Sequence, residues 1–244
     1  EPTERIVERA RMLKDAFEIA LLRDAAVRLD RVMPAALLSV RAGTTEARVA
    51  GAIEAAMREA GYERPAFDTI VASGPNSALP HHRAGERTLA AGDLVVLDFG
   101  GVLGGYCSDV TRTVSIGAPS REAQRVYAAV HEAQAAAIAA VRPGVDASSV
   151  DAAARGALAA HGLDHVFGHG TGHGLGLDVH EDPRIGQPRP ESPSATIEPG
   201  MVFTIEPGAY LPGFGGVRIE DDVLVTATGC EVLTRIPREL VSLS

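Results

Sequence analysis

Four acidic side chains stand where short apolar segments end. Asp98 follows the apolar residues at 94–97, and Asp109 comes 11 residues later, a separation that a hairpin could close to bring both carboxylates together. Glu206 follows a similar segment, and Glu220 comes directly before two further acids. Burying an acid is costly unless it is paired or bound to a metal. These four are therefore candidate ligands, with turn aspartates or an exposed edge-strand glutamate as the alternative.

A glycine-rich segment supplies imidazoles. His169, His173 and His180 lie within 12 residues of one another, among glycines that allow the backbone to approach a ligand closely. A phosphate-binding loop is disfavoured, because the segment has no GKS/T sequence and its glycines do not follow the GxGxxG spacing after a strand. We expect a metal or catalytic histidine site here, and a surface loop with incidental histidines is the alternative.

The candidate ligands favour a particular class of metal. Carboxylates with one imidazole and no thiolate suit Mn, Fe, Co or Zn in a reactive site more than a structural zinc. Two divalent cations would balance four carboxylate charges, whereas one would leave excess buried negative charge. Two ions about 3.5–4 Å apart can bridge a water, lower its pKa and polarise a carbonyl, so amide hydrolysis is the expected reaction. The ligand set is Asp98, Asp109, His173, Glu206 and Glu220.

Helices and strands must position these residues. Apolar periodicity and capping residues predict helices at 3–40, from Thr44 or Thr45 to about 60, from Ser120 to 141, and from Asp146 to 162. Short apolar runs between turn residues predict strands. These lie at 69–73, 94–97, 105–107, 110–114, 201–205, 217–219, 222–225 and 231–234.

The order of these elements indicates an internal duplication. At an offset of 101 residues, Gly43 aligns with Gly144 and Gly61 with Gly162, each at a helix end. We expect a single domain over 1–244, with α-α-β repeats at roughly 15–115 and 120–230. Two such halves facing each other would leave a cleft lined by strands from both.

Composition narrows the class of protein. The 244 residues carry 23 basic and 32 acidic side chains, a net charge of −9, so nucleic acid and anionic membranes are not expected partners. Cys107 and Cys230 are too few for a disulfide framework. The first 15 residues are too charged for a signal peptide, and there is no long apolar run. A cytoplasmic protein is expected.

Together these motifs resemble the "pita-bread" metallopeptidase family M24, which includes methionine aminopeptidase, aminopeptidase P and Xaa-Pro dipeptidase. The ligand order Asp, Asp, His, Glu, Glu is complete, and the resemblance covers the chain from about residue 5. The sequences Thr204-Ile-Glu206-Pro-Gly and Gly216-Val-Arg218-Ile-Glu220-Asp resemble the proline-specific branch. The resemblance implies an α+β fold, with two pseudo-symmetric α-α-β repeats around a curved antiparallel sheet.

The resemblance also implies a role for each site residue. Asp98 would chelate one ion, Asp109 and Glu220 would bridge both, and His173 and Glu206 would hold the other, with Glu206 as general base and acid. His81 would be catalytic on the substrate side, with His82 as the neighbour that could be confused with it, and His180 would stabilise the tetrahedral intermediate. His169, Tyr210 and Arg218 match substrate-pocket positions, while Thr111 and Arg218 match positions that support the metal ligands.

The implied activity is that of a dinuclear exopeptidase. It would hydrolyse the bond between an N-terminal residue and proline in short peptides, using a hydroxide that bridges two ions, Mn first and Co, Zn or Fe as alternatives. A homodimer is expected, and the N-terminal domain usual in proline-specific relatives is expected to be absent. The alternatives are a methionine-aminopeptidase-type enzyme, a metal-free creatinase-like amidinohydrolase and a non-catalytic peptide-binding module.

Overall fold

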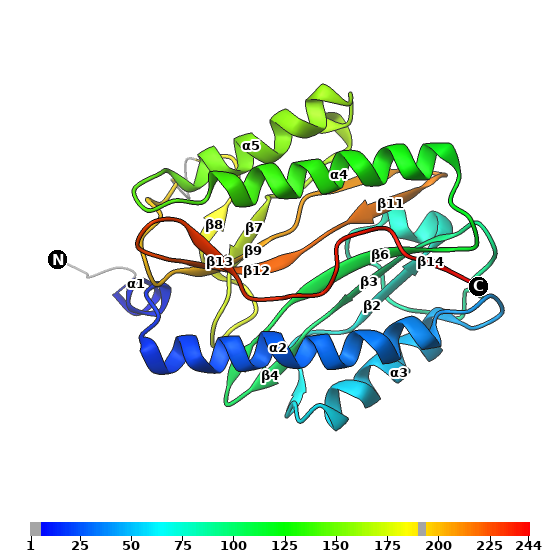
Figure 1. Cartoon of the computed structure of the whole chain (residues 1–244), viewed down its shortest axis with the longest axis horizontal. Helices are drawn as coiled ribbons and strands as arrows, with labels where there is room; N and C mark the ends of the chain where they lie inside the picture. The colour runs from blue at the N-terminus through cyan, green and yellow to red at the C-terminus, as the bar shows by residue number, and fades with distance from the viewer. Residues whose placement is uncertain (1–5, 190–193) are drawn as a thin grey trace.

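Two pairs of helices enclose the strands in the computed structural model, which describes residues 6–189 and 194–244 (Figure 1). The helices are α1 (Ile6–Met12), α2 (Ala16–Ser39), α3 (Glu46–Glu59), α4 (Arg121–Ala140) and α5 (Ala147–Ala160), with 3-10 turns η1 (Gly74–Ala78) and η2 (Asp164–Val166). The strands are β1 (Arg64–Pro65), β2 (Ile70–Ser73), β3 (Leu94–Phe99), β4 (Gly101–Leu103), β5 (Tyr106–Cys107), β6 (Val110–Ile116), β7 (Gly172–Gly174), β8 (Glu181–Ile185), β9 (Val202–Ile205), β10 (Gly208–Leu211), β11 (Gly215–Arg218), β12 (Asp221–Val225), β13 (Cys230–Val232) and β14 (Ser242–Leu243).

Each helix pair covers its own set of strands. In the first half, α2 and α3 bury an apolar cluster against β2, β3 and β6, which run antiparallel to one another. In the second half, α4 and α5 pack over β9 and its neighbours in the sheet ordered β13-β12-β9-β7-β8. A third cluster joins Leu22 of α2 to Val202 and Leu224 of this second sheet, so the halves share buried apolar surface.

Capping residues define the helix boundaries. The side chains of Thr45, Ser120 and Asp146 accept backbone N–H groups at the starts of α3, α4 and α5. This confirms the predicted starts at Ser120 and Asp146, and of the two caps predicted for α3 it is Thr45 rather than Thr44. The single helix predicted at 3–40 is wrong. It is divided at Asp15, which forms a capping box with Glu18 and starts a new helix, and residues 3–5 lie outside the described part.

The strands of the histidine segment were not predicted from sequence. Strands β7 and β8 are short and rich in Gly or Pro, so they lack the apolar alternation that marks a strand. Glu220 lies between β11 and β12 and forms an isolated β-bridge with Thr111 of β6.

That bridge lies where the two halves meet. The N–H of Glu220 donates to the carbonyl of Thr111 at 3.1 Å, and the N–H of Arg218 donates to Thr113 Oγ1 at 3.0 Å. These contacts hold the end of β11 against β6.

Across the part of the chain described here, no helix is long and apolar enough to cross a membrane.

Candidate metal centre

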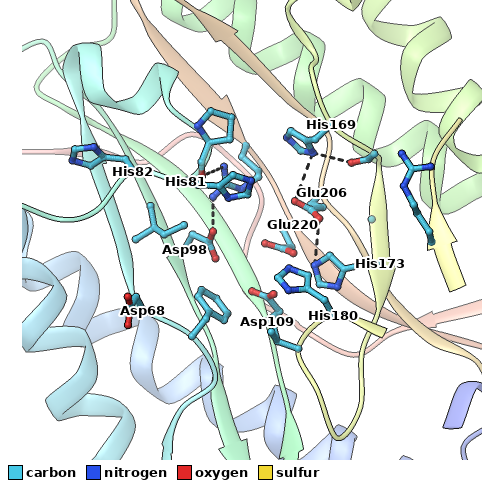
Figure 2. Close-up of a pocket in the computed structure, with 18 of the residues that line it drawn as sticks. Asp68, His81, His82, Asp98, Asp109, His169, His173, His180, Glu206 and Glu220 are labelled. Carbon is cyan, nitrogen blue, oxygen red and sulfur yellow. Dashed lines mark hydrogen bonds and ion pairs between the residues drawn. The ribbon is translucent and has the colours of Figure 1, made fainter. Parts of the chain in front are cut away.

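A cavity of about 440 Å³ opens where the strands of the two halves meet, and its size suits a small-molecule ligand (Figure 2). Thr111 and Tyr210 do not line it, but both are buried behind it and contact residues that do. The predicted site residues that line it are His81, Asp98, Asp109, His169, His173, His180, Glu206, Arg218 and Glu220.

Three of the five predicted ligands form a tight group. One ligand atom from each of Asp109, His173 and Glu220 lies within 4.8 Å of the other two. They come from three places in the chain: the residue before β6, the middle of β7, and the junction of β11 and β12. Figure 2 shows these side chains pointing toward one another into the cavity.

Close contacts between strands bring His173 to this place. A Cβ on Gly172 would lie 1.8 Å from the carbonyl oxygen of Thr204 in β9, and one on Gly174 would lie 2.1 Å from that of Asp182 in β8. The residues that flank His173 must therefore be glycines for β7 to fit between its neighbours. At these two positions the close approach is to other strands rather than to a ligand.

The orientation of His173 suits metal binding. Its Nδ1 lies 3.2 Å from the carbonyl of Gly174, which can only accept, so Nδ1 carries the proton. The lone pair of Nε2 then faces Glu206 Oε1 at 3.4 Å. Burial, and after it the nearby His180, lowers the pKa of His173 to about 4. The imidazole is therefore neutral near pH 7, as a metal ligand requires.

Arg218 connects several of the predicted residues. Its guanidinium forms an ion pair with Asp98 and donates to the hydroxyl of Tyr210 at 3.0 Å and to Thr111 Oγ1 at 3.2 Å. The Thr111 hydroxyl in turn donates to Glu220 Oε2. Asp98 and Glu220 are therefore held by the same cation and its neighbours. The supporting role expected for Thr111 and Arg218 behind the metal ligands stays a prediction.

The same chain of hydrogen bonds reaches His169. The Gly170 carbonyl can only accept, so the proton of the neutral His169 ring lies on Nδ1, 2.8 Å from that carbonyl and 4.0 Å from Glu206 Oε2. His169 Nε2 then accepts from the Tyr210 hydroxyl at 2.8 Å, and the Tyr210 oxygen accepts from Arg218. Burial, and then Arg218, lowers the pKa of His169 to about 4.

Burial makes negative charge unfavourable in this cluster. It raises the pKa of Asp109 and of Glu220 well above the usual values, and the neighbouring carboxylates add to both shifts. Burial also raises the pKa of Glu206 to about 8, against the opposing effect of Arg218. Carboxyl groups in such surroundings bind protons or cations to lower their charge.

The donor atoms fit a divalent cation. Asp98 Oδ1 and Asp109 Oδ1 are buried, and neither has a hydrogen-bond partner among the described residues. Buried polar oxygens are nearly always satisfied, so these two indicate a partner of another kind. Carboxylate oxygens with one neutral imidazole match the preferences of Mn, Fe, Co and Zn. The residues are therefore compatible with a metal centre.

His180 and His81 also line the cavity. The ring of His180 lies 4.3 Å from that of His173, centroid to centroid, with the two planes at 65°. Burial, followed by the nearby His81, lowers the pKa of His180, so its ring favours the neutral form. His81 is exposed on a loop after η1, on the same side of the cavity as Asp98 of β3.

The sequence interpretation missed Asp222. This buried acid accepts the N–H of Asp109 at 3.1 Å through Oδ2, and its Oδ1 has no hydrogen-bond partner among the described residues. Burial raises its pKa well above the usual value. The only signal in the sequence is its place in the acidic run that begins at Glu220.

Comparisons with known proteins place the chain in a family. The model of metallopeptidase family M24 matches residues 20–227, and the chain belongs to this family. It is 42% identical over 236 residues to an Xaa-Pro dipeptidase of Pyrococcus horikoshii, covering 97% of this chain and 66% of that protein. The chain spans about two thirds of the length of the curated relatives it matches.

Solved structures show the same fold. An Xaa-Pro dipeptidase from Bacillus anthracis matches with a TM-score of 0.95 at 43% identity, covering 99% of this chain and 67% of that one. An X-Pro aminopeptidase from Thermotoga maritima matches with a TM-score of 0.94 at 41% identity, with coverage of 99% and 67%. The predicted α+β pita-bread fold and the family are therefore confirmed.

Proposed function

We propose that this chain is the catalytic part of a metal-dependent exopeptidase that cleaves between an N-terminal residue and proline in short peptides. The observation that carries the proposal is the convergence of Asp109, His173 and Glu220 in one cavity. Relatives named Xaa-Pro dipeptidase and X-Pro aminopeptidase support the proline specificity. Because names of both kinds occur among them, dipeptidase and aminopeptidase activities are tested side by side.

Five side chains would hold two divalent ions, Mn in the first place and Co, Zn or Fe as alternatives. These are Asp98, Asp109, His173, Glu206 and Glu220, which offer oxygen and imidazole donors. When bound, such ions supply Lewis-acid polarisation of a peptide carbonyl and activation of a water molecule.

Side chains of the protein would transfer the protons and stabilise the charge that develops on the substrate. Glu206 carries a carboxylate that faces the cavity beside two imidazoles, so it can accept a proton and return it to the leaving amine. His180 and His81 line the same cavity, and their ring N–H groups would donate to the substrate and stabilise charge that develops on its carbonyl oxygen. His169 lines the pocket wall beside Glu206, and Tyr210 would hold the His169 ring from behind.

The assembly and location belong to the same proposal. We infer a homodimer in the cytoplasm that acts on peptide substrates, because the family resemblance implies dimerisation and two cysteines are too few for the disulfide framework of a secreted protein. Size-exclusion chromatography with light scattering tests the dimer. A monomer that is fully active would contradict it.

The activity test is a series of substrates at defined metal content. The purified protein, loaded with Mn or Co, is assayed on Xaa-Pro dipeptides, Xaa-Pro tripeptides and matched Met-Ala peptides. Release of the N-terminal residue from Xaa-Pro substrates only is the expected result, and chain length separates dipeptidase from aminopeptidase. Turnover of Met-Ala peptides alone would favour the methionine-aminopeptidase type. No turnover at full metal occupancy would contradict the proposal and favour a peptide-binding module.

A further inference from the structure

A buried acid outside the metal centre organises the loop that carries His81. Glu46 is the first residue of α3 and is 0% exposed. No cation of a Lys or Arg contacts it in the described part of the chain. A buried carboxylate is costly unless donors surround it, so the groups that satisfy Glu46 must be held in place.

Those donors all come from one short segment. Glu46 Oε1 accepts the N–H of Ser73 at 2.8 Å, its hydroxyl at 2.7 Å, and the amide of Asn76 at 3.0 Å. Glu46 Oε2 lies 2.7 Å from His82 Nε2 and accepts the N–H of Gly85 at 3.4 Å. One side chain therefore gathers residues 73–85 around the start of α3. Although burial would raise the pKa of Glu46, these hydrogen bonds lower it overall, which keeps the carboxylate charged.

His82 has a defined role in this contact. A charged carboxylate can only accept, so His82 Nε2 must carry the proton that joins the two side chains. His82 is turned away from the carboxylates of the metal centre, while the preceding His81 lies on their side of the segment (Figure 2). The His81 side chain is exposed, so its position depends on the backbone that Glu46 and His82 hold.

The other side of the segment is attached to β11. Ser77 Oγ accepts the N–H of Gly216 at 2.8 Å, and Arg218 donates to the carbonyl of Pro80 at 3.4 Å. The residue before His81 is thus tied to the strand that leads to the metal centre. The residue after His81 is tied to Glu46. The two attachments fix His81 from both directions.

We propose that Glu46 and His82 are a positioning pair that sets the place of His81 at the substrate side of the cavity. The inference rests on the proposed function, because it takes His81 to contact the peptide. Neither side chain hydrogen-bonds a predicted metal ligand. Loss of the pair should therefore weaken the use of substrate without removing metal.

The first test compares variants of the pair. Glu46→Gln keeps the shape of the side chain but presents an NH₂ group to donors that need an acceptor. Glu59→Gln is the matched control, since Glu59 is an exposed acid at the other end of the same helix. We expect Glu46→Gln and His82→Ala to lower kcat/KM on an Xaa-Pro dipeptide about tenfold or more, as loss of a charge-assisted hydrogen bond would. His82→Gln, which keeps a donor, should recover part of the loss, and metal content should match the wild type.

A double-mutant cycle separates positioning from general weakening of the fold. If Glu46 acts through His81, adding Glu46→Gln to His81→Ala lowers kcat/KM by less than about twofold. Equal effects of Glu46→Gln in both backgrounds would overturn the proposal. If Glu46→Gln does not fold, the same cycle is run with His82→Ala, which removes only one contact at a partly exposed side chain.

A second measurement needs no activity. Trypsin can cut after Arg83, which is exposed within the segment. Because cleavage follows the population of the locally open state, Glu46→Gln and His82→Ala should be cut at 83–84 about tenfold faster than the wild type and Glu59→Gln. Unchanged cleavage and unchanged kcat/KM would overturn the pair while leaving the proposed function intact. An inactive wild type with accelerated cleavage in the variants would contradict the proposed function but support the anchoring of the segment.

Discussion

At the scale of single residues, Glu206 is placed between two imidazoles, where it could accept and donate a proton. Its two carboxylate oxygens lie 3.4 Å from His173 Nε2 and 4.0 Å from His169 Nδ1. We expect Glu206→Gln to lower kcat by about 10² to 10⁴-fold, the usual contribution of a general acid and base. Steady-state kinetics on an Xaa-Pro dipeptide, at measured metal content, checks this. His165→Ala, which changes an exposed histidine in η2, is the control and should keep its activity.

Arg218 is a second residue whose exact chemistry matters. Its planar guanidinium reaches Asp98, Tyr210 and Thr111 at once, which the single ammonium of a lysine cannot do. We expect Arg218→Lys to weaken metal binding about 10 to 100-fold, as loss of support behind metal ligands does. A titration with Mn followed by calorimetry measures the affinity. Affinity equal to that of the wild type would show that Arg218 does not support the ligands.

Some of the site could be predicted from residue types alone. The order and spacing of the acids and His173 indicated the ligand set, and the structure brings Asp109, His173 and Glu220 together. Their roles, and those of Asp98 and Glu206, stay predictions. Asp222 and Glu46 could not be found in this way. Each is an ordinary acid in the sequence, and only the fold shows that it is buried among backbone donors.

At the scale of elements, strand β7 depends on the glycines beside His173. A Cβ at Gly172 would lie 1.8 Å from the Thr204 carbonyl, closer than any real contact, so β7 and β9 would have to separate. We expect Gly172→Ala to lower the free energy of unfolding by about 3 kcal/mol. Gly156→Ala is the matched control in helix α5, where nothing lies within 4 Å, and it should be neutral or stabilising by about 0.5–1 kcal/mol. Thermal unfolding of both variants checks this, and equal midpoints would count against the strand contact.

The elements themselves were predicted unevenly, for a physical reason. Helix starts at Thr45, Ser120 and Asp146 were found because an N-cap is a local interaction between a side chain and the next turn. Strands β7 and β8 are neighbours in the chain and pair with each other, but the register of this pairing is irregular and no apolar alternation marks either strand. The glycines of β7 are required by its contacts with β8 and β9, which the sequence does not show.

At the scale of the whole molecule, helix pairs and strands meet around one cavity. The pita-bread fold was predictable because the ligand motifs and the order of elements indicated the same family. The duplication at 15–115 and 120–230 stays a prediction. The contact between the two halves of the molecule could not be predicted from the sequence. It depends on the bridge between Thr111 and Glu220, which are 109 residues apart and join β6 to the residue between β11 and β12.

The acidic groups buried where the two halves meet predict how the stability of the metal-free protein depends on pH. Burial raises the pKa of Glu206 from 4.5 in the unfolded chain to about 8, and it raises the pKa of Asp109 and Glu220 as well. The folded state then binds more protons than the unfolded state, so these groups favour folding at low pH and lose that contribution as pH rises toward 8. His169 and His173 act oppositely, because folding lowers their pKa values from 6.5 to about 4, so their effect on stability increases with pH between these values. Above pH 6.5 this increase is complete, and these histidines add no further pH dependence.

Between pH 6.5 and 8 the carboxylates therefore dominate, and the metal-free protein should become less stable as pH rises. Bound cations reverse this, because they require the ligands in their deprotonated form and bind only the folded state. A hundredfold excess of metal over its Kd should add about 2.7 kcal/mol of stability. Thermal unfolding with a chelator, and with Mn, at both ends of this pH range measures the two slopes. A metal-free midpoint that rises with pH would contradict a buried cluster of four acids, and so would a midpoint at pH 8 that Mn leaves unchanged. Such a cluster must bind either protons or cations to lower its charge.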